Sequence, residues 1–457
     1  MNRHGHDIDM LHGPLWSKLL LFALPLMASS VLQLLFNAAD VIVVGRYAGD
    51  ASLAAVTSTG SIVHLMVNLF MGLSVGTNVI AAHALGREDD QALEKTVHTA
   101  ILISLIGGVI LTVAGFFLCP ILLRIMESPH NVIGLSSLYL RIYFLGMPAM
   151  LAYNFGSSLL RAQGDTQRPM IFLAVAGVIN VILNLILVIV FHLDVAGVAI
   201  ATIISQYISC ALVLFCLTRE TGPLHLDLRR LRIDLTALKN IAVIGLPAGM
   251  QGIVFSLSNM VIQSSINSFG DTLMAGSGAA ANIEGFVYVS MNAFYQTCLT
   301  FTGQNYGAGK PKRVDRVILL CEGFVAVAGM VSGGIAYAFA RPLLHIYSPS
   351  DEVVAWGILR MTYVCLPYFL CGVMDVLVGA LRGLGTSLVP MCVSIAGVCG
   401  VRLMWIFTVF RAVHTPQCLF LAYPISWTAT ALIHFCCLLF VRKRAYKKIE
   451  VVEAVSV

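Results

Sequence analysis

The chain has 457 residues, of which 58% are hydrophobic and only 11% are charged. Soluble domains are about 45 to 50% apolar and about 25% charged, so this composition excludes an ordinary water-soluble globule. The net charge of +5 comes from 28 Lys and Arg against 23 Asp and Glu. In so apolar a chain, basic residues first indicate membrane topology, and they give no support to a nucleic-acid partner.

Twelve apolar segments follow one another along the chain, each long enough to cross about 30 Å of hydrocarbon as a helix. The first six lie near residues 19–44, 52–84, 96–119, 133–158, 169–191 and 195–217. The second six lie near residues 238–268, 274–305, 317–340, 353–380, 388–410 and 418–441. We therefore predict an all-α integral membrane protein with twelve transmembrane helices.

A polar loop divides these segments into two lobes. We predict a cytoplasmic N-terminus (1–18), an N-lobe (19–217), a cytoplasmic loop (218–237), a C-lobe (238–441) and a cytoplasmic tail (442–457). With both termini inside, 21 of the 28 Lys and Arg fall on cytoplasmic segments and only four fall outside. The positive-inside rule then predicts a multi-pass protein of the cell (plasma or inner) membrane with both termini in the cytoplasm.

The two halves resemble each other at an offset near 220 residues. The aligned landmarks, which keep their order, include Leu24-Pro25 with Leu246-Pro247, Pro169-Met170 with Pro390-Met391, and Ala176-Gly177-Val178 with Ala396-Gly397-Val398. Because each half has six spans, we expect two six-helix lobes related by a pseudo-twofold axis along the membrane normal. Such repeats are typical of transporters, whose sites lie near the middle of the membrane.

Four carboxylates lie inside the predicted spans, where a charge must be functional or paired. They are Asp40, Glu284, Glu322 and Asp375. Asp40 lies about 33 Å of helix beyond Lys18, in the outer half of the first span, where an unpaired carboxylate can bind a proton or a cation. A position at the lipid headgroups is the alternative for Asp40. Glu322 lies close to Arg316 in sequence, and we expect it to snorkel or pair locally.

Amide and hydroxyl groups of the first half can surround Asp40. Asn180 and Asn184 are four residues apart on one helical face, and Asn154 and Thr202 lie on neighbouring spans. The matching positions of the second half are Ile262, Gly400 and Met404. A purely structural feature would be expected in both halves, which favours a cation-coupling site in the first, although ordinary interhelical hydrogen bonding is the alternative.

Further polar residues are predicted to line a substrate cavity. They are Gln33, Asn37, Gln251, Asn259, Glu284 and Asp375. Arg402 is a possible structural partner for Glu284, since buried ions commonly pair. Pro25 is expected to let the first helix bend. We predict no cofactor and no metal centre, apart from a weak sodium site at Asp40.

Three segments carry a resemblance to a known family: Gly303-Gln-Asn-Tyr-Gly-Ala-Gly-Lys310, Val195 to Thr202, and Leu160-Arg-Ala-Gln-Gly-Asp165. On these the chain resembles the multidrug and toxic compound extrusion (MATE) family over essentially its whole length. The resemblance implies a twelve-helix antiporter that exports organic cations in exchange for protons or sodium.

The resemblance also implies roles for particular residues. In DinF-type members, cation coupling is carried by the positions that match Asp40, Asn180, Asn184 and Thr202. Asn184 departs from that branch, which often has Asp there, and the missing carboxylate weakens a sodium site. NorM-type members rely on second-lobe acids, for which Asp375 is the nearest match, about one helical turn from the expected spacing.

The sequence therefore predicts a monomeric, proton- or sodium-coupled antiporter that exports amphipathic organic cations by alternating access and is not an enzyme. A lipid-linked saccharide flippase is the alternative, because Arg141, Arg360 and Arg402 could neutralise a pyrophosphate. A membrane receptor or scaffold without transport is the third reading.

Overall fold

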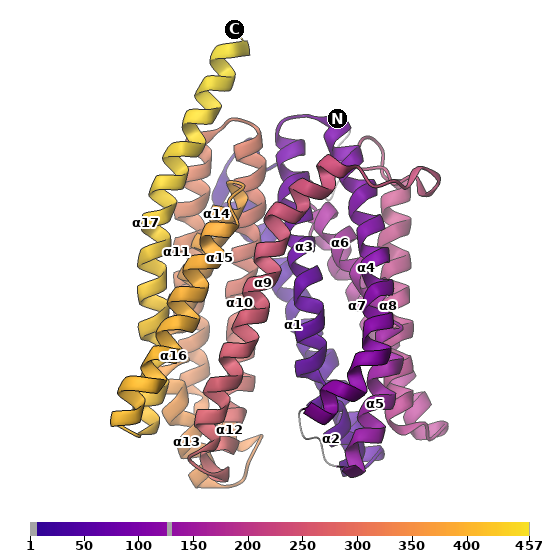
Figure 1. Ribbon diagram of the computed structural model, residues 1–457, viewed down its shortest axis with the longest axis vertical. Helices are drawn as coiled ribbons and strands as arrows, with labels where there is room; N and C mark the ends of the chain where they lie inside the picture. The colour runs from indigo at the N-terminus through magenta and orange to yellow at the C-terminus, as the bar shows by residue number, and fades with distance from the viewer. Residues whose placement is uncertain (1–6, 126–129, 457) are drawn as a thin grey trace. The chain divides into compact units, whose positions relative to one another are not determined.

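The structure is a computed structural model that describes residues 7–125 and 130–456, and within these ranges every regular element is helical (Figure 1). The first half comprises α1 (Leu15–Tyr47), α2 (Asp50–Ser58), α3 (Gly60–Gly86), α4 (Asp90–Ile125), α5 (His130–Phe144), α6 (Met147–Gln163), α7 (Gln167–Leu185) and α8 (Asp194–Arg219). The second half comprises α9 (Leu235–Asn267), α10 (Asp271–Gly307), α11 (Pro311–Ala338), α12 (Ala340–His345), α13 (Asp351–Tyr363), α14 (Phe369–Gly383), α15 (Leu388–Ser394), α16 (Val401–Trp405) and α17 (Pro416–Ser456). The predicted all-α fold is confirmed.

The helices are long and apolar enough to cross a membrane. Among the described residues, ten helical stretches pass this test alone, and α5 with α6 form an eleventh span that bends by 48°. The remaining predicted span is α10, which has 37 residues but carries polar groups such as Glu284 and Asn292. These polar groups lower its hydropathy and leave its length sufficient for a twelfth crossing.

The chain forms two compact units. Unit 1 contains Met1–Ile8 and Ala28–Gly249, and unit 2 contains Asp9–Met27 and Met250–Val457. The first helix of each half is therefore shared: α1 belongs to unit 2 up to Met27, and α9 belongs to unit 1 up to Gly249. In both helices the change of unit follows shortly after a proline, Pro25 or Pro247, at positions that the internal repeat aligns.

Within unit 1, Gly72 and Gly76 of α3 lie against Gly245 and Gly249 of α9 and let the two helices approach closely. A Cβ atom on Gly72 would lie 2.2 Å from the backbone nitrogen of Gly249, and one on Gly76 would lie 2.4 Å from the carbonyl oxygen of Ile241. Small residues four apart commonly allow such contact between transmembrane helices.

We expect Gly72→Ala to destabilise unit 1 by about 1 to 3 kcal/mol, because the added methyl group must push two backbones apart. Gly134→Ala is the matched control, since nothing lies within 4 Å of a Cβ there and the change should be neutral or slightly stabilising. Thermal unfolding of the purified protein in detergent measures both. Equal melting temperatures for the two variants would contradict the close packing.

Within unit 2, the segment before α1 is held by side chains from the end of α10 and the start of α11, in and beside the Gly303–Lys310 run. Asn305 Nδ2 donates to the carbonyl oxygen of Met10 over 3.2 Å, and Arg313 donates to the carbonyls of Met10, His12 and Gly13, each over 3.0 Å. Phe22 packs edge-on against Phe301, with 5.3 Å between ring centroids. Asn305 of this run, together with Phe301 and Arg313 on either side of it, therefore anchors the start of the first helix.

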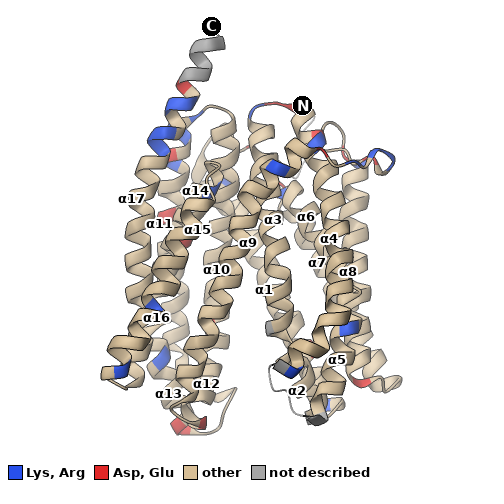
Figure 2. Cartoon of the chain, viewed as in Figure 1, with Lys and Arg blue, Asp and Glu red and all other residues tan. Residues whose placement is uncertain are grey.

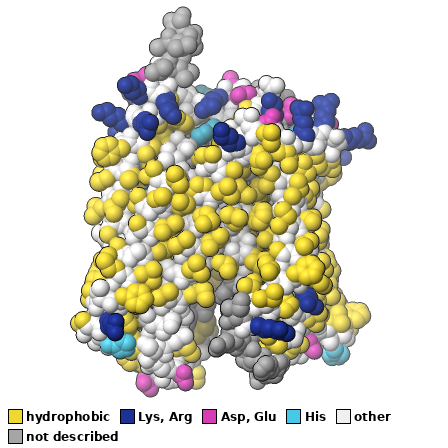
Figure 3. Space-filling view, in the orientation of Figure 1, with side chains coloured by type: hydrophobic (Ala, Val, Ile, Leu, Met, Phe, Trp, Pro, Cys, Tyr) yellow, Lys and Arg dark blue, Asp and Glu magenta, His cyan; other side chains and the backbone are white. Residues whose placement is uncertain are grey.

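Charged side chains lie mainly at the ends of the helices. In unit 2, basic residues gather at the end of the helices where α17 finishes (Figure 2). The visible face carries hydrophobic side chains over the middle of the helices and Lys and Arg near their ends (Figure 3). A hydrophobic band bounded by charge is the surface that a bilayer requires.

Candidate functional site

The predicted polar cluster forms in unit 1 around Asp40. Asn184 Nδ2 donates to Asp40 Oδ1 and, over 3.3 Å, to Asn180 Oδ1. Asn180 Nδ2 in turn donates to Thr202 Oγ1 over 3.5 Å. One hydrogen-bonded chain thus joins α1, α7 and α8, because the spacing of four residues puts both asparagines on the same face of α7.

The two asparagines of this cluster are buried, Asp40 and Thr202 are partly exposed, and one buried polar atom is left without a partner among the described residues. Asn184 is 0% exposed, and its Oδ1 has no hydrogen-bond partner within the described part of the chain. A buried acceptor without a donor is costly, and a proton or cation held between Asp40 and this oxygen would relieve the cost. Tyr139 and Tyr143 of α5 lie within electrostatic range of Asp40, and the sequence alone did not identify them.

Three predicted site residues of unit 1 lie outside this hydrogen-bonded chain. Asn154 donates to the carbonyl oxygen of Met150 on its own helix over 2.8 Å. Gln33 and Asn37 are exposed side chains of α1. Pro25, the predicted helix bend, belongs to unit 2 and lies inside α1, which continues as one helix from Leu15 to Tyr47.

The helix that carries the asparagines ends in a π-helical turn that the internal repeat reproduces. The turn spans Ile186–Val190 after α7 and Ile406–Phe410 after α16, which are 220 residues apart. A further π-helical segment, Ile395–Gly400, precedes α16 and lies where the first half has regular α7. Such turns are rare and frequently occur at functional sites.

Unit 2 contains a partly open cavity of about 520 Å³. Its lining includes three of the predicted cavity residues, Asn259, Glu284 and Asp375. Its aromatic lining residues are Phe255, Tyr288, Tyr368, Tyr423 and Trp427, and its basic ones are Arg360 and Arg402. This volume suits a small organic molecule.

Glu284 pairs with Arg360 of α13, which corrects the sequence-based suggestion of Arg402. Arg360 Nη2 and Nε donate to the two carboxylate oxygens of Glu284 over 2.8 and 3.0 Å, and Arg360 Nη1 donates to Ser277 Oγ over 2.8 Å. Both charged residues are buried. Two parallel hydrogen bonds make this a strong pair, and it ties α13 to α10.

Two other polar residues have partners that differ from expectation. Gln251 does not line the cavity, and its Oε1 accepts a hydrogen bond from Arg382 Nη2 over 2.9 Å. Glu322 was expected to snorkel or pair with Arg316, but both its carboxyl oxygens are buried without a hydrogen-bond partner among the described residues. Asp375 lines the cavity and forms no ion pair within the described residues, and Tyr288 and the charge of Arg382 lie close enough to act on its carboxylate.

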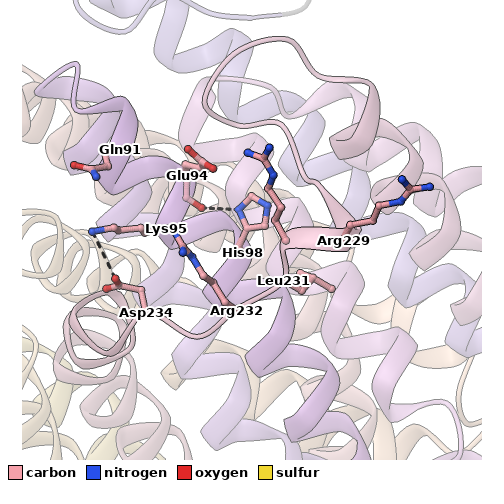
Figure 4. Close-up of a pocket in the computed structure, with 9 residues that line it drawn as sticks. Gln91, Glu94, Lys95, His98, Arg229, Leu231, Arg232 and Asp234 are labelled. Carbon is pink, nitrogen blue, oxygen red and sulfur yellow. Dashed lines mark hydrogen bonds and ion pairs between the residues drawn. The ribbon is translucent and has the colours of Figure 1, made fainter.

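A second cavity of about 510 Å³, in unit 1, lies where residues 229–234 pass α4 (Figure 4). Lys95 Nζ lies 3.6 Å from Asp234, and His98 Nε2 accepts a hydrogen bond from the backbone of Asp227 over 3.2 Å. The backbone N–H of Ala237 donates to Asp234 and holds the pKa of that carboxyl below its usual range. These contacts fasten the loop between the halves to α4.

Comparison with known proteins identifies the class. The sequence profile of the MatE family matches residues 25–186 and again residues 247–408. The two matches are offset by 222 residues, which confirms the internal repeat. The chain therefore belongs to the MatE family, whose members are multidrug efflux transporters of the membrane and not enzymes.

Several relatives share most of this chain. The probable multidrug resistance protein YpnP of Bacillus subtilis is 30% identical over 83% of this chain and 85% of that protein. The probable multidrug resistance protein YoeA of the same organism is 28% identical over 85% of each. A structure of an outward-facing multidrug resistance MATE family transporter of the MOP superfamily gives a TM-score of 0.90 at 21% identity, covering 98% of this chain and 100% of that one.

Proposed function

We propose that the protein is a proton-coupled antiporter that exports amphipathic organic compounds by alternating access. Asp40 carries the coupling proton, and the aromatic cavity of unit 2 contributes to substrate binding. The observation that carries this proposal is the hydrogen-bonded chain from Asp40 through Asn184 and Asn180 to Thr202.

The chemistry of this cluster favours a proton over sodium. Its hydrogen-bonded chain has one carboxylate, and Asn184 presents an N–H group to that carboxylate. Hard metal cations prefer several oxygen ligands at once, whereas one carboxylate suffices for a proton. Sodium is the second candidate, because Asn184 Oδ1 and Thr202 Oγ1 are additional oxygens nearby.

The substrate class follows from the unit 2 cavity. Its aromatic lining suits a planar apolar body, and Asp375 can hold a positively charged group of the substrate. Two of the three arginines considered for a pyrophosphate-binding flippase give it little support, and only Arg402 lines the cavity without an ion pair among the described residues. Arg360 is neutralised by Glu284, and Arg141 is an exposed side chain over the ring of Phe116.

We place both termini in the cytoplasm and the protein in the cell membrane, as a monomer. The excess of Lys and Arg on the terminal and inter-lobe segments supports this orientation. A reporter protein fused after Val457 tests the position of the C-terminus. In intact cells the reporter should fold and be protected from protease that is added outside.

Uptake of a fluorescent amphipathic organic cation into inverted vesicles tests the coupling. A pH gradient of one unit supplies about 1.4 kcal/mol per proton, enough for roughly tenfold accumulation. We expect uptake with a pH gradient and none with a sodium gradient of equal size. Uptake driven by the sodium gradient would make sodium the coupling ion. If neither gradient drives uptake, the proposal of an antiporter is contradicted.

A further inference from the structure

Arg402 is a buried cation in the unit 2 cavity whose charge has no carboxylate partner. Its side chain is 5% exposed and lines the cavity. Its Nε donates to Ser426 Oγ over 3.0 Å, and within the described chain its two terminal nitrogens donate no hydrogen bond and form no ion pair. A buried guanidinium normally pairs with an anion, so the missing partner requires an explanation.

Besides the hydrogen bond to Ser426, the contacts that compensate the charge of Arg402 within the described chain are with aromatic rings. The guanidinium carbon of Arg402 lies 4.4 Å from the ring centroid of Tyr423 and 5.6 Å from that of Trp427. Cation–π contacts hold the guanidinium plane in place, but they leave its terminal N–H groups without acceptors. Arg402 is thus oriented by Tyr423, Trp427 and Ser426 with its donors available to a ligand.

An aromatic wall continues from this arginine through the cavity. Trp427 stacks on Tyr368 with 5.2 Å between ring centroids, and Tyr368 stacks on Tyr288 with 6.2 Å. Trp427 therefore joins the guanidinium to a stack of three rings from separate elements, all of which line the cavity. A planar ring of a ligand can stack on such a wall while an acidic substituent meets Arg402.

The local backbone and the internal repeat point to the same residue. Arg402 lies in α16, between the π-helical segments Ile395–Gly400 and Ile406–Phe410. The matching residue of the first half is Ile182, which is 51% exposed and sits in regular α7. Arginine and the additional π-helical segment thus occur together in one half only, as expected for a binding feature and unlike a structural repeat.

We infer that the unit 2 cavity binds planar aromatic compounds through an oxyanion group, such as a carboxylate, held by the guanidinium of Arg402. This inference deepens the proposed function and rests on it, because it names the class of compound exported. Asp375 in the same cavity leaves room for a second, positively charged substituent, so aromatic zwitterions fit as well as simple aromatic acids.

Ligand binding to the purified full-length protein in detergent tests the inference without any ion gradient. The probes are 2-naphthoate, its neutral amide 2-naphthamide, and a 2-naphthyl trimethylammonium cation, each titrated by calorimetry. We expect 2-naphthoate to bind at least about tenfold more tightly than 2-naphthamide, as a charge-assisted bidentate contact implies. Equal binding of the acid and the amide, tighter binding of the cation than of the acid, or no binding of 2-naphthoate would overturn it.

Two arginine variants locate the contact. Arg402→Gln should weaken 2-naphthoate binding by about tenfold or more and leave 2-naphthamide binding within about twofold. Arg411→Gln, an exposed arginine of the same unit outside the cavity lining, is the matched control and should bind both probes as the unmodified protein does. An acid preference that survives in Arg402→Gln would contradict the assignment.

The inference and the proposed coupling fail in different ways. Asp40→Asn should keep the preference for 2-naphthoate, because Asp40 lies in unit 1 and the cavity lies in unit 2. If Arg402→Gln proves too unstable to purify, the comparison of 2-naphthoate and 2-naphthamide on the unmodified protein still tests whether the cavity prefers an oxyanion. Arg402→Lys then serves as the second variant, and it should bind 2-naphthoate more weakly because lysine lacks the planar fork.

Discussion

Replacing Asp40 by asparagine should abolish gradient-driven export while leaving the folded protein intact. Asparagine keeps the shape of the side chain and can still accept the hydrogen bond from Asn184, but it can neither gain nor lose a proton. The variant then cannot draw on the roughly 1.4 kcal/mol per pH unit or the roughly 2.3 kcal/mol per charge and 100 mV that drive accumulation. We expect uptake into inverted vesicles to fall to the level of protein-free vesicles.

Asp271→Asn is the matched control for this substitution. Asp271 is an exposed carboxylate at the start of α10, outside the cluster, and its loss should leave export unchanged. Thermal unfolding should show that both variants fold like the unmodified protein. Normal export by Asp40→Asn would remove Asp40 from the mechanism, and equal loss in both variants would indicate a general effect of lowered negative charge.

The sequence was sufficient for the fold and for most of the Asp40 cluster because both depend on local periodicity. Span lengths follow from hydropathy, and two asparagines four residues apart must share a helical face. The contact of Asp40 with Asn184 then required only that the first and fifth spans of one lobe be neighbours. The glycine pairs were predictable for the same reason, since small residues four apart mark close packing.

Other parts of the site depend on helix rotation, which hydropathy does not specify. Arg360 and Arg402 are both buried arginines of the second half, and only the structure shows that Arg360 faces Glu284. The π-helical segment Ile395–Gly400 changes the angular position of each residue that follows it, including Arg402. The stacking of Tyr288, Tyr368 and Trp427 could not be predicted from the sequence either, because the three residues come from distant segments.

Breaking the pair between Arg360 and Glu284 should destabilise unit 2 more than any surface substitution. Arg360→Met leaves a buried carboxylate without its two hydrogen bonds, and such losses cost about 3 to 5 kcal/mol. The exposed pair between Arg341 and Asp351, 3.5 Å apart, provides the matched control. Arg341→Met should cost less than about 1 kcal/mol, because water screens an exposed pair.

A double substitution distinguishes an uncompensated charge from simple loss of packing. In Arg360→Met with Glu284→Leu, both charges are absent and apolar groups fill the space, so most of the lost stability should return. Thermal unfolding of the four proteins in the same detergent measures the coupling between the two positions. If the double variant were less stable than Arg360→Met, the ion pair itself, and not the desolvation of one unpaired charge, would hold α13 against α10.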